Sequence, residues 1–378
     1  MIYFDNSATT AMYPEAIKAY TDVASRIVGN PSSLHNLGTI ATRLLDASRK
    51  QIADLLGFSS EEIFFTSGGS EGDNWIIKGV AFEKKKYGKH IIVSSIEHPA
   101  VKNTAEWLTS QGFEVDYAPV DTEGFVDVKA LEKLIRQDTI LISVMAVNNE
   151  VGSIQRLKEI AALIKTEPTI GFHIDAVQAI GKIDLSEFLL PRVDFATFSA
   201  HKFHGPRGVG FVYIKAGKRL APLIHGGEQE SGRRSTTENL AGIVATAKAL
   251  RLTLEDTEMK RVHVAKMKKV IYDELKSHEE IVVFSGLDNF AANILTWGIK
   301  GIRGEVVVHA FEEYEIYLST TSACSSKKNA AAGTLMAMNV NPKLATSAVR
   351  ISLDYTNSMT EVEMFLTVFR QILAKLAK

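Results

Sequence analysis

The chain has one cysteine, Cys324, and its neighbours are small hydroxyl side chains and lysines rather than apolar residues. A structural cysteine behaves as a small hydrophobe and is usually buried, whereas a reactive one needs exposure and nearby positive charge that favours the thiolate. Lys327 and Lys328 follow Cys324 closely and supply such charge. The surroundings are therefore those of a reactive cysteine, and an incidental surface thiol is the alternative.

A lysine and an aspartate each follow an apolar segment with the composition of a β-strand. Lys202 comes after DFATFS and before a Gly/Pro turn and a second apolar segment. A lysine between two apolar strands is expected to have a lowered pKa, which makes its amine nucleophilic and suited to a Schiff base; a surface lysine is the alternative. Asp175 ends the segment GFHID, where a buried carboxylate is costly unless it meets a cation. No lysine or arginine is adjacent to Asp175, so another group must supply the charge.

Two further strand-like segments lead into glycines and a histidine at predicted helix starts. SGGSEG, residues 67–72, follows IFFT; its glycines permit close backbone approach, and the N-terminus of the next helix offers N–H groups to a phosphate. The run lacks the lysine and spacing of a nucleotide-binding P-loop. His98 precedes Pro99 at another predicted helix start, where an imidazole tends to stay neutral. A simple turn and a structural histidine are the alternatives.

Together these residues match the requirements of pyridoxal 5'-phosphate. This cofactor needs a lysine for covalent attachment and a carboxylate that faces its pyridinium nitrogen. Lys202 and Asp175 meet those needs, and the pyridinium would supply the positive charge that is missing beside Asp175. His98 could stack on the ring, and residues 67–72 could hold the phosphate. Asn149, after another strand-like segment, could orient a ligand or cap the next element.

Seven segments rich in β-branched and aromatic residues alternate with helical patterns from about residue 60 to 215. They are IFFTS, HIIVSS, FEVDYAP, TILISVMAV, GFHIDAV, DFATFSA and GVGFVYI. This alternation predicts an α/β fold with a largely parallel sheet. Ligands of such sheets bind outside the carboxyl ends of the strands, which is where Lys202, Asp175 and His98 would lie.

The flanking sequence predicts further helices and a second unit. Residues 14–27 and 39–57 have helical patterns, the first opened by Pro14 and the second closed by Gly57. A long amphipathic helix is expected over residues 258–278, followed by strands in EIVVFSG and NILTWGI. We place the start of a smaller C-terminal domain near residue 258.

The composition is that of an ordinary soluble globular protein, with 46% hydrophobic and 23% charged residues in a chain of 378. A formal net charge of -1 gives no global electrostatic reason to bind nucleic acid or a membrane. One cysteine forms no internal disulfide, and no Cys/His array has zinc-ligand spacing, so we expect a reducing compartment and no metal site. The start, MIYFDNSATT, lacks the apolar run of a signal peptide or membrane anchor.

A series of motifs along nearly the whole chain resembles the cysteine desulfurases of the NifS/IscS type, within the class V aminotransferase group of pyridoxal phosphate enzymes. In chain order these motifs are IYFDNSATT, GNPSSLH, FFTSGGSEGDN, EHPAV, VNNEVG, HIDAVQAIGK, FSAHKFHGPRGVG, HGGEQE, RRSTTEN, SACSS and AVRISL. Their order and spacing make the resemblance specific.

The resemblance implies a role for each matching residue. Lys202 would bond covalently to the cofactor, with Asp175 at its pyridinium nitrogen and Gln178 at its phenolic oxygen. His98 would stack on the ring and shuttle protons. Asn149 and Arg350 would bind the substrate carboxylate, and Cys324 would accept the sulfur. The phosphate would be bound by Gly69, Ser70, Ser199, His201 and, from a second subunit, Thr237.

The resemblance also implies an architecture and a reaction. The architecture would be a pyridoxal phosphate fold type I homodimer with a mostly parallel seven-stranded sheet in a large domain, residues 15–257, and a smaller α/β domain, residues 1–14 plus 258–378. L-cysteine would lose its sulfur to the Cys324 thiolate, giving L-alanine and a persulfide. The sulfur would pass to an acceptor protein such as an iron–sulfur scaffold or a tRNA-thiolation enzyme, in the cytoplasm, without direct binding to nucleic acid or membrane.

Several positions depart from the family pattern. Thr320, Thr321 and Thr236 occupy segments in which the family pattern contains glycine. Gly72 occupies a position where serine is common, and Asp354 occupies one where glycine is common.

The alternative functions are a lyase acting on selenocysteine or cysteine sulfinate, an aminotransferase of the same fold, and a non-catalytic sulfur-relay scaffold. An aminotransferase has no use for Cys324, and a scaffold has no need of Lys202. Residues 322–333 are rich in small and polar side chains, which predicts a mobile, accessible segment.

Overall fold

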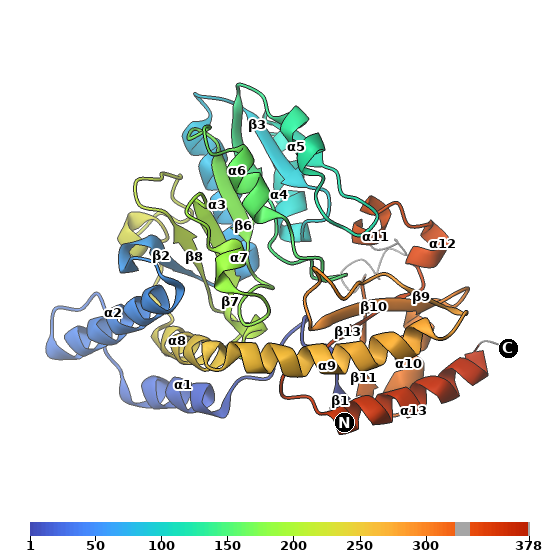
Figure 1. The fold of residues 1–378 in the computed structure, drawn as a ribbon. Helices are drawn as coiled ribbons and strands as arrows, with labels where there is room; N and C mark the ends of the chain where they lie inside the picture. Colours follow the sequence, from blue (N-terminus) through green and yellow to red (C-terminus); the bar gives the residue numbers. More distant parts are fainter. Residues whose placement is uncertain (322–332, 377–378) are drawn as a thin grey trace.

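The computed structural model, shown in Figure 1, describes residues 1–321 and 333–376. Its main feature is a seven-stranded sheet. The strands are β2 (Ile63–Thr66), β3 (His90–Ser94), β4 (Glu114–Ala118), β5 (Thr139–Ser143), β6 (Gly171–Asp175), β7 (Phe195–Ser199) and β8 (Gly210–Ile214), in the order β2-β8-β7-β6-β5-β3-β4. Strand β8 is antiparallel to β2 and β7, and the other pairs are parallel. All seven predicted strands and the mostly parallel sheet are confirmed.

The sheet is apolar on both faces because helices cover both. Along β2, Phe64 packs with one group of buried residues and Phe65 with the other, as expected from the two-residue period of a strand. The first face is covered by α3 (Gly69–Lys84) and α4 (Pro99–Thr109). Residues of α6 (Leu157–Leu163), α7 (Leu185–Phe188) and α8 (Leu240–Leu254) belong to the second core, together with α1 (Pro14–Arg26) and α2 (Asn36–Leu56).

The predicted helices are present with small shifts at their ends. Helix α2 begins at Asn36, before the predicted residue 39, because Nδ1 of His35 accepts the backbone N–H of Gly38 at 3.2 Å and caps the helix. It ends before Gly57, whose φ of 74° is readily adopted only by glycine. The helix predicted over residues 258–278 is α9 (Thr257–Lys276).

A second, antiparallel sheet forms in the C-terminal third. It consists of β12 (Ser319–Thr320), β13 (Ala348–Ser352), β10 (Ile294–Ile299) and β9 (Ile281–Val283), in that order. Helices α9, α10 (Gly304–Glu312) and α13 (Met359–Leu376) pack on it around a separate apolar core (Figure 1). That core includes Ile2 and Phe4, and β1 (Ile2–Tyr3) pairs with β11 (Ile316–Tyr317). The N-terminus thus packs with the C-terminal third; the predicted domain boundaries stay a prediction.

The remaining elements are short. They are α5 (Val128–Leu134), α11 (Gly333–Ala337), α12 (Pro342–Ala345) and the 3-10 turns η1 (Ser60–Glu62), η2 (Ala200–Lys202) and η3 (Glu230–Gly232). Within the described ranges, no helix has the length and apolar character needed to cross a membrane. The same ranges contain no group of three His, Cys, Asp or Glu side chains arranged to hold a metal ion.

Candidate active site

Lys202 lies in η2, directly after the carboxyl end of β7, and is held by the N-terminal segment of the chain. Its Nζ donates to the carbonyl oxygens of Ser7 at 2.6 Å and Ala8 at 2.8 Å. The same segment bonds to this turn again, since Thr10 N–H donates to the carbonyl of His201 at 3.0 Å. The amine is therefore fixed at the edge of the sheet where ligands of parallel sheets bind.

Asp175 ends β6, the neighbour of β7, and is 5% exposed. One carboxylate oxygen, Oδ1, accepts the N–H of Val177 at 2.9 Å. Burial raises the pKa of Asp175, while the nearby charges of His98 and Lys202 oppose that rise. The fold thus brings these three predicted residues into one electrostatic neighbourhood, although they come from three separate strand ends.

His98 is the cap residue before α4, as its position ahead of Pro99 predicted. Its Nδ1 accepts the backbone N–H of Ala100 at 3.1 Å, which leaves Nε2 as the nitrogen that can meet a ligand. Burial lowers the pKa of His98; the carboxylate of Asp175 opposes this and the ammonium of Lys202 adds to it. The imidazole is therefore favoured in its neutral form.

The start of α3 forms a close contact with the ends of β6 and β7. A Cβ built on Gly69 would come within 2.7 Å of Val177 Cγ2, and 3.6 Å from Cβ of Ser199. A side chain at position 69 would clash, so glycine lets the helix terminus approach these strand ends. Ser70 follows in the first turn and is exposed, while Ser199 is buried. A helix N-terminus with small neighbours suits a phosphate.

His201 and Gln178 both contact the N-terminal segment. Nδ1 of His201 lies 3.1 Å from Thr9 Oγ1, and Nε2 of Gln178 donates to the carbonyl of Ser7 at 2.9 Å. Burial, with the charges of Lys202 and Arg207, lowers the pKa of His201 to about 4. Both residues are thus near Lys202, and their predicted cofactor contacts stay predictions.

Thr237 lies in the segment just before α8. It is exposed and lines a cavity of about 150 Å³ with Ser67, Arg234 and Thr236 among others. Arg234 ties this segment to α3 through Glu71, with Nε and Oε1 2.7 Å apart. The prediction that Thr237 acts from a second subunit stays a prediction.

Arg350 lies on β13 and reaches the same edge from the second sheet. Its Nη1 donates to the carbonyl of Asn149 at 2.7 Å, and its Nη2 to Asp5 Oδ1 at 2.8 Å. Its Nε is buried and has no hydrogen-bond partner within the described residues. The guanidinium is therefore held in place by Asp5 and the backbone of Asn149, and its planar array of donors is of the kind that binds a carboxylate. Asn149 contributes its backbone carbonyl to this contact, and its predicted role at the substrate carboxylate stays a prediction.

Cys324 and residues 322–332 around it lie outside the described residues, and so does most of the segment predicted to be mobile. A cavity of about 340 Å³ opens beside His98 and Ser70, along the facing sides of α3 and α4. Its lining includes Lys78, whose Nζ lies 4.7 Å from the centre of the Trp107 ring.

Sequence reasoning missed two buried acids behind the site. Glu97 is 4% exposed; its Oε1 accepts hydrogen bonds from Ser94 Oγ and, at 2.7 Å, from Met145 N–H. Asp73, on α3, is 1% exposed and lies 3.7 Å from His173. Burial, together with the charge of Asp175, raises the pKa of both acids, that of Glu97 to about 8. Only the position of Glu97 directly before His98 could have singled it out.

Glu97 gives a stability prediction. Because its pKa rises from 4.5 to about 8 on folding, its contribution to stability is complete below pH 4.5 and is lost as the pH rises through about 8. Glu97→Gln keeps the oxygen that accepts both hydrogen bonds and removes the titration. We therefore expect the free energy of unfolding of Glu97→Gln, minus that of the native protein, to increase as the pH rises from 4.5 to about 8. Denaturant titrations at a series of pH values measure this difference. A constant difference would mean that Glu97 is ionised in the fold.

Comparison with known proteins places the chain among relatives of full length. A family model described as aminotransferase class-V matches residues 2–365. The "NifS/IcsS protein homolog" of Lactobacillus delbrueckii subsp. bulgaricus is 50% identical, over 100% of this chain and 98% of that protein. The "Cysteine desulfurase IscS" of Methanosarcina thermophila is 41% identical, over 99% of this chain and 92% of that protein.

A solved structure named "NIFS-LIKE PROTEIN" is similar over the whole fold. It superimposes with a TM-score of 0.93 at 40% identity, and the match covers 99% of this chain and 100% of that one. The similarity therefore includes both sheets and every strand end described above. The chain belongs to the aminotransferase class-V family and, within it, to the NifS/IscS type.

Proposed function

We propose that the protein is a pyridoxal phosphate-dependent cysteine desulfurase, which takes sulfur from L-cysteine and forms L-alanine. The observation that carries the proposal is the meeting of Lys202, Asp175 and His98 at one sheet edge, within reach of one another's charges. Arg350 adds a carboxylate-binding group from the second sheet. The names of the relatives support the same activity.

The residues present fit the cofactor. Lys202 would attach it, Asp175 would face its pyridinium nitrogen, and Gly69, Ser70, Ser199 and His201 would surround its phosphate. The close approach at Gly69 and the burial of a carboxylate at Asp175 are both features that such a group would use. When bound, the cofactor supplies an electron sink for negative charge that develops at the substrate α-carbon.

The chain's own residues would hold the substrate and move its protons. Arg350, fixed by Asp5 and Asn149, would bind the substrate carboxylate. His98 would present Nε2 to the α-carbon and transfer protons there. The carbonyls of Ser7 and Ala8 hold the amine of Lys202 in position.

The sulfur step would use Cys324. Its thiolate attacks the sulfur of the substrate, an S–S bond forms, and the C–S bond breaks with its electron pair left on carbon. The carbon then takes up a proton and becomes the methyl group of alanine. Cys324 keeps the sulfur as a persulfide and, as the only thiol in the chain, passes it to a thiol outside the chain. We propose an acceptor protein for iron–sulfur or tRNA-thiolation chemistry as this partner, and a homodimer as the working form, in the cytoplasm.

The decisive experiment measures alanine and sulfide released from L-cysteine by the cofactor-loaded protein. Equal amounts of the two, in the presence of a thiol reductant, are expected. Parallel reactions with selenocysteine, cysteine sulfinate, or an amino acid plus an oxo acid test the related lyases and the aminotransferase. If none of these reactions gave a product, the non-catalytic sulfur-relay scaffold would be the remaining function.

His98→Ala is expected to retain the cofactor and to lower kcat by about 10²-fold or more, the usual contribution of a positioned acid or base. The Nε2 of His98 is the group placed to move protons, whereas cofactor attachment depends on Lys202. Visible absorbance and steady-state kinetics measure the two effects separately. Unchanged kcat would make His98 only a helix cap.

Asp175→Asn is expected to weaken cofactor retention and to lower kcat by about 10²-fold, the scale of one lost electrostatic contact in a buried site. The amide keeps the oxygen that accepts the Val177 N–H but removes the negative charge. Dialysis followed by absorbance measures retention, and alanine release measures kcat. Normal retention and turnover would contradict the predicted role of this carboxylate.

A further inference from the structure

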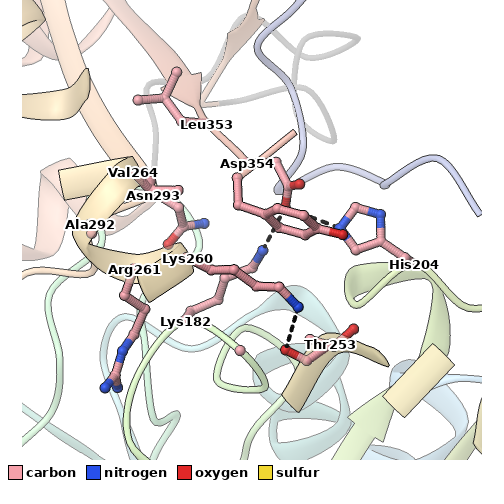
Figure 2. Close-up of a pocket in the computed structure, with 12 residues that line it drawn as sticks. Lys182, His204, Thr253, Lys260, Arg261, Val264, Ala292, Asn293, Leu353 and Asp354 are labelled. Carbon is pink, nitrogen blue, oxygen red and sulfur yellow. Dashed lines mark hydrogen bonds and ion pairs between the residues drawn. The ribbon is translucent and has the colours of Figure 1, made fainter. Parts of the chain in front are cut away.

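Asp354 is a buried carboxylate that follows β13 and contacts a lysine and a histidine from two loops of the large sheet. It is 1% exposed, and its Oδ2 accepts from Lys182 Nζ at 3.2 Å and lies 3.1 Å from His204 Nε2 (Figure 2). Its other oxygen, Oδ1, accepts the backbone N–H and the hydroxyl of Thr356, at 3.2 Å and 3.0 Å. We call Lys182, His204 and Asp354 the Asp354 clasp.

His204 is fixed on every side. Its Nδ1 faces the carbonyl of Ala11 at 2.8 Å, so each ring nitrogen lies within hydrogen-bond distance of an oxygen. Tyr13 stacks on the ring, with centroids 4.4 Å apart. The backbone has a φ of 61°, which is uncommon for a residue with a side chain. Such constraints fix the position of the His204 side chain and of the turn that carries it.

The space beside the clasp is too small for a ligand. The cavity lined by these residues and by Lys260 and Arg261 has a volume of about 20 Å³, enough for one water molecule (Figure 2). Lys182, His204 and Asp354 therefore bond to one another rather than to a ligand. Since desolvation offsets much of the energy of a buried ion pair, stability alone is a weak reason to keep them.

The clasp connects the elements that carry the site. His204 is two residues after Lys202, and Asp354 is four residues after Arg350. Lys182 follows Asp175 in the loop after β6. A single carboxylate thus joins the strand of the substrate-binding arginine to the two loops that carry the cofactor-binding residues.

We propose that Asp354 is a positioning residue, which through Lys182 and His204 fixes Arg350 at the correct distance from Lys202. The proposal rests on the proposed function, because it assigns Arg350 to the substrate carboxylate.

Asp354→Asn tests the proposal in the full-length, cofactor-loaded protein. We expect KM for L-cysteine to rise about tenfold while kcat stays within about twofold and the cofactor spectrum is unchanged, since a loss of uniform substrate binding raises KM alone. The matched control is Asp194→Asn. Asp194 is likewise buried, at 2% exposed, and contacts Arg192 at 2.8 Å and Lys218 at 3.0 Å, but it lies before β7, at the opposite edge of the sheet.

A second pair of variants covers the case in which Asp354→Asn does not fold. Lys182 is 11% exposed, so Lys182→Gln removes the ion pair at the rim of the cluster, and Lys182→Arg restores it. We expect the glutamine variant to raise KM and the arginine variant to return it toward the native value. A similar rise in KM in Asp194→Asn, or a fall in kcat equal to the rise in KM, would overturn the positioning role.

Hydrogen exchange of the peptide that covers residues 348–357 separates this proposal from the proposed function. Faster exchange is expected in Asp354→Asn and Lys182→Gln than in Asp194→Asn. If the native protein releases no alanine from L-cysteine, the proposed function fails and the exchange result alone decides whether the clasp holds β13. Equal exchange in all variants would refute the clasp.

Discussion

Lys202→Ala is expected to remove the visible absorbance of lysine-bound cofactor and to lower alanine release by about 10⁴-fold or more, as removal of the nucleophile in covalent catalysis does. The reason is positional. Lys202 is the amine that the carbonyls of Ser7 and Ala8 hold at the end of β7, next to Asp175 and His98. Added primary amines would restore activity only in part, because they lack this fixed position.

Absorbance after reconstitution and alanine release measure the effect. Lys215→Ala is the matched control, since Nζ of Lys215 also donates to a backbone carbonyl, that of Pro191, but at the opposite edge of the sheet. The control should keep both the spectrum and the activity. A Lys202→Ala protein that kept the native spectrum after dialysis against cysteine would refute the assignment.

Cys324→Ser is expected to keep the cofactor and bind L-cysteine, yet to form no persulfide and pass no sulfur to an acceptor. A hydroxyl cannot take the place of a thiolate as nucleophile toward sulfur, and the chain has no second thiol. Labelled-sulfur transfer to candidate acceptor proteins, followed by non-reducing gel analysis, measures the loss. Ser326→Ala, in the same segment, is the control and should transfer normally.

Undiminished transfer by Cys324→Ser would remove this cysteine from the mechanism and favour direct release of sulfide. Hydrogen exchange across residues 322–333 tests the separate prediction that the segment is mobile and reaches an external acceptor. Strong protection there would contradict that prediction while leaving the chemical role of Cys324 open to the transfer experiment.

The fold was largely predictable because its signals are local. Buried strands in a sheet covered on both faces appear as short apolar runs such as TILIS and GFHID, and the alternation of such runs with helices predicts parallel pairing. The resulting fold class, pyridoxal phosphate fold type I, agrees with the family. The start of α2 was missed by three residues because its cap is a histidine, which the usual cap preferences do not include.

The candidate site was predictable where it depends on strand ends. Lys202, Asp175 and His98 could be grouped from sequence because the carboxyl ends of parallel strands share one edge. Asp5, Ser7 and Ala8 could not be assigned contacts in the same way. Ser7 and Ala8 act through their backbone carbonyls, which no sequence pattern identifies. They also lie almost 200 residues away from Lys202 in the chain.

By itself the sequence determined the strands, the sheet class, the family and the identity of the residues that can do the chemistry, because residue type and periodicity encode these directly. The tertiary structure decided which groups surround them. It placed the N-terminal segment against Lys202, put Asp5 on Arg350, and buried Glu97 beside Asp175. Each of these contacts joins residues that lie far apart in the chain. Desolvation and hydrogen bonds between such distant residues, rather than any local motif, set the charge state and position of each group.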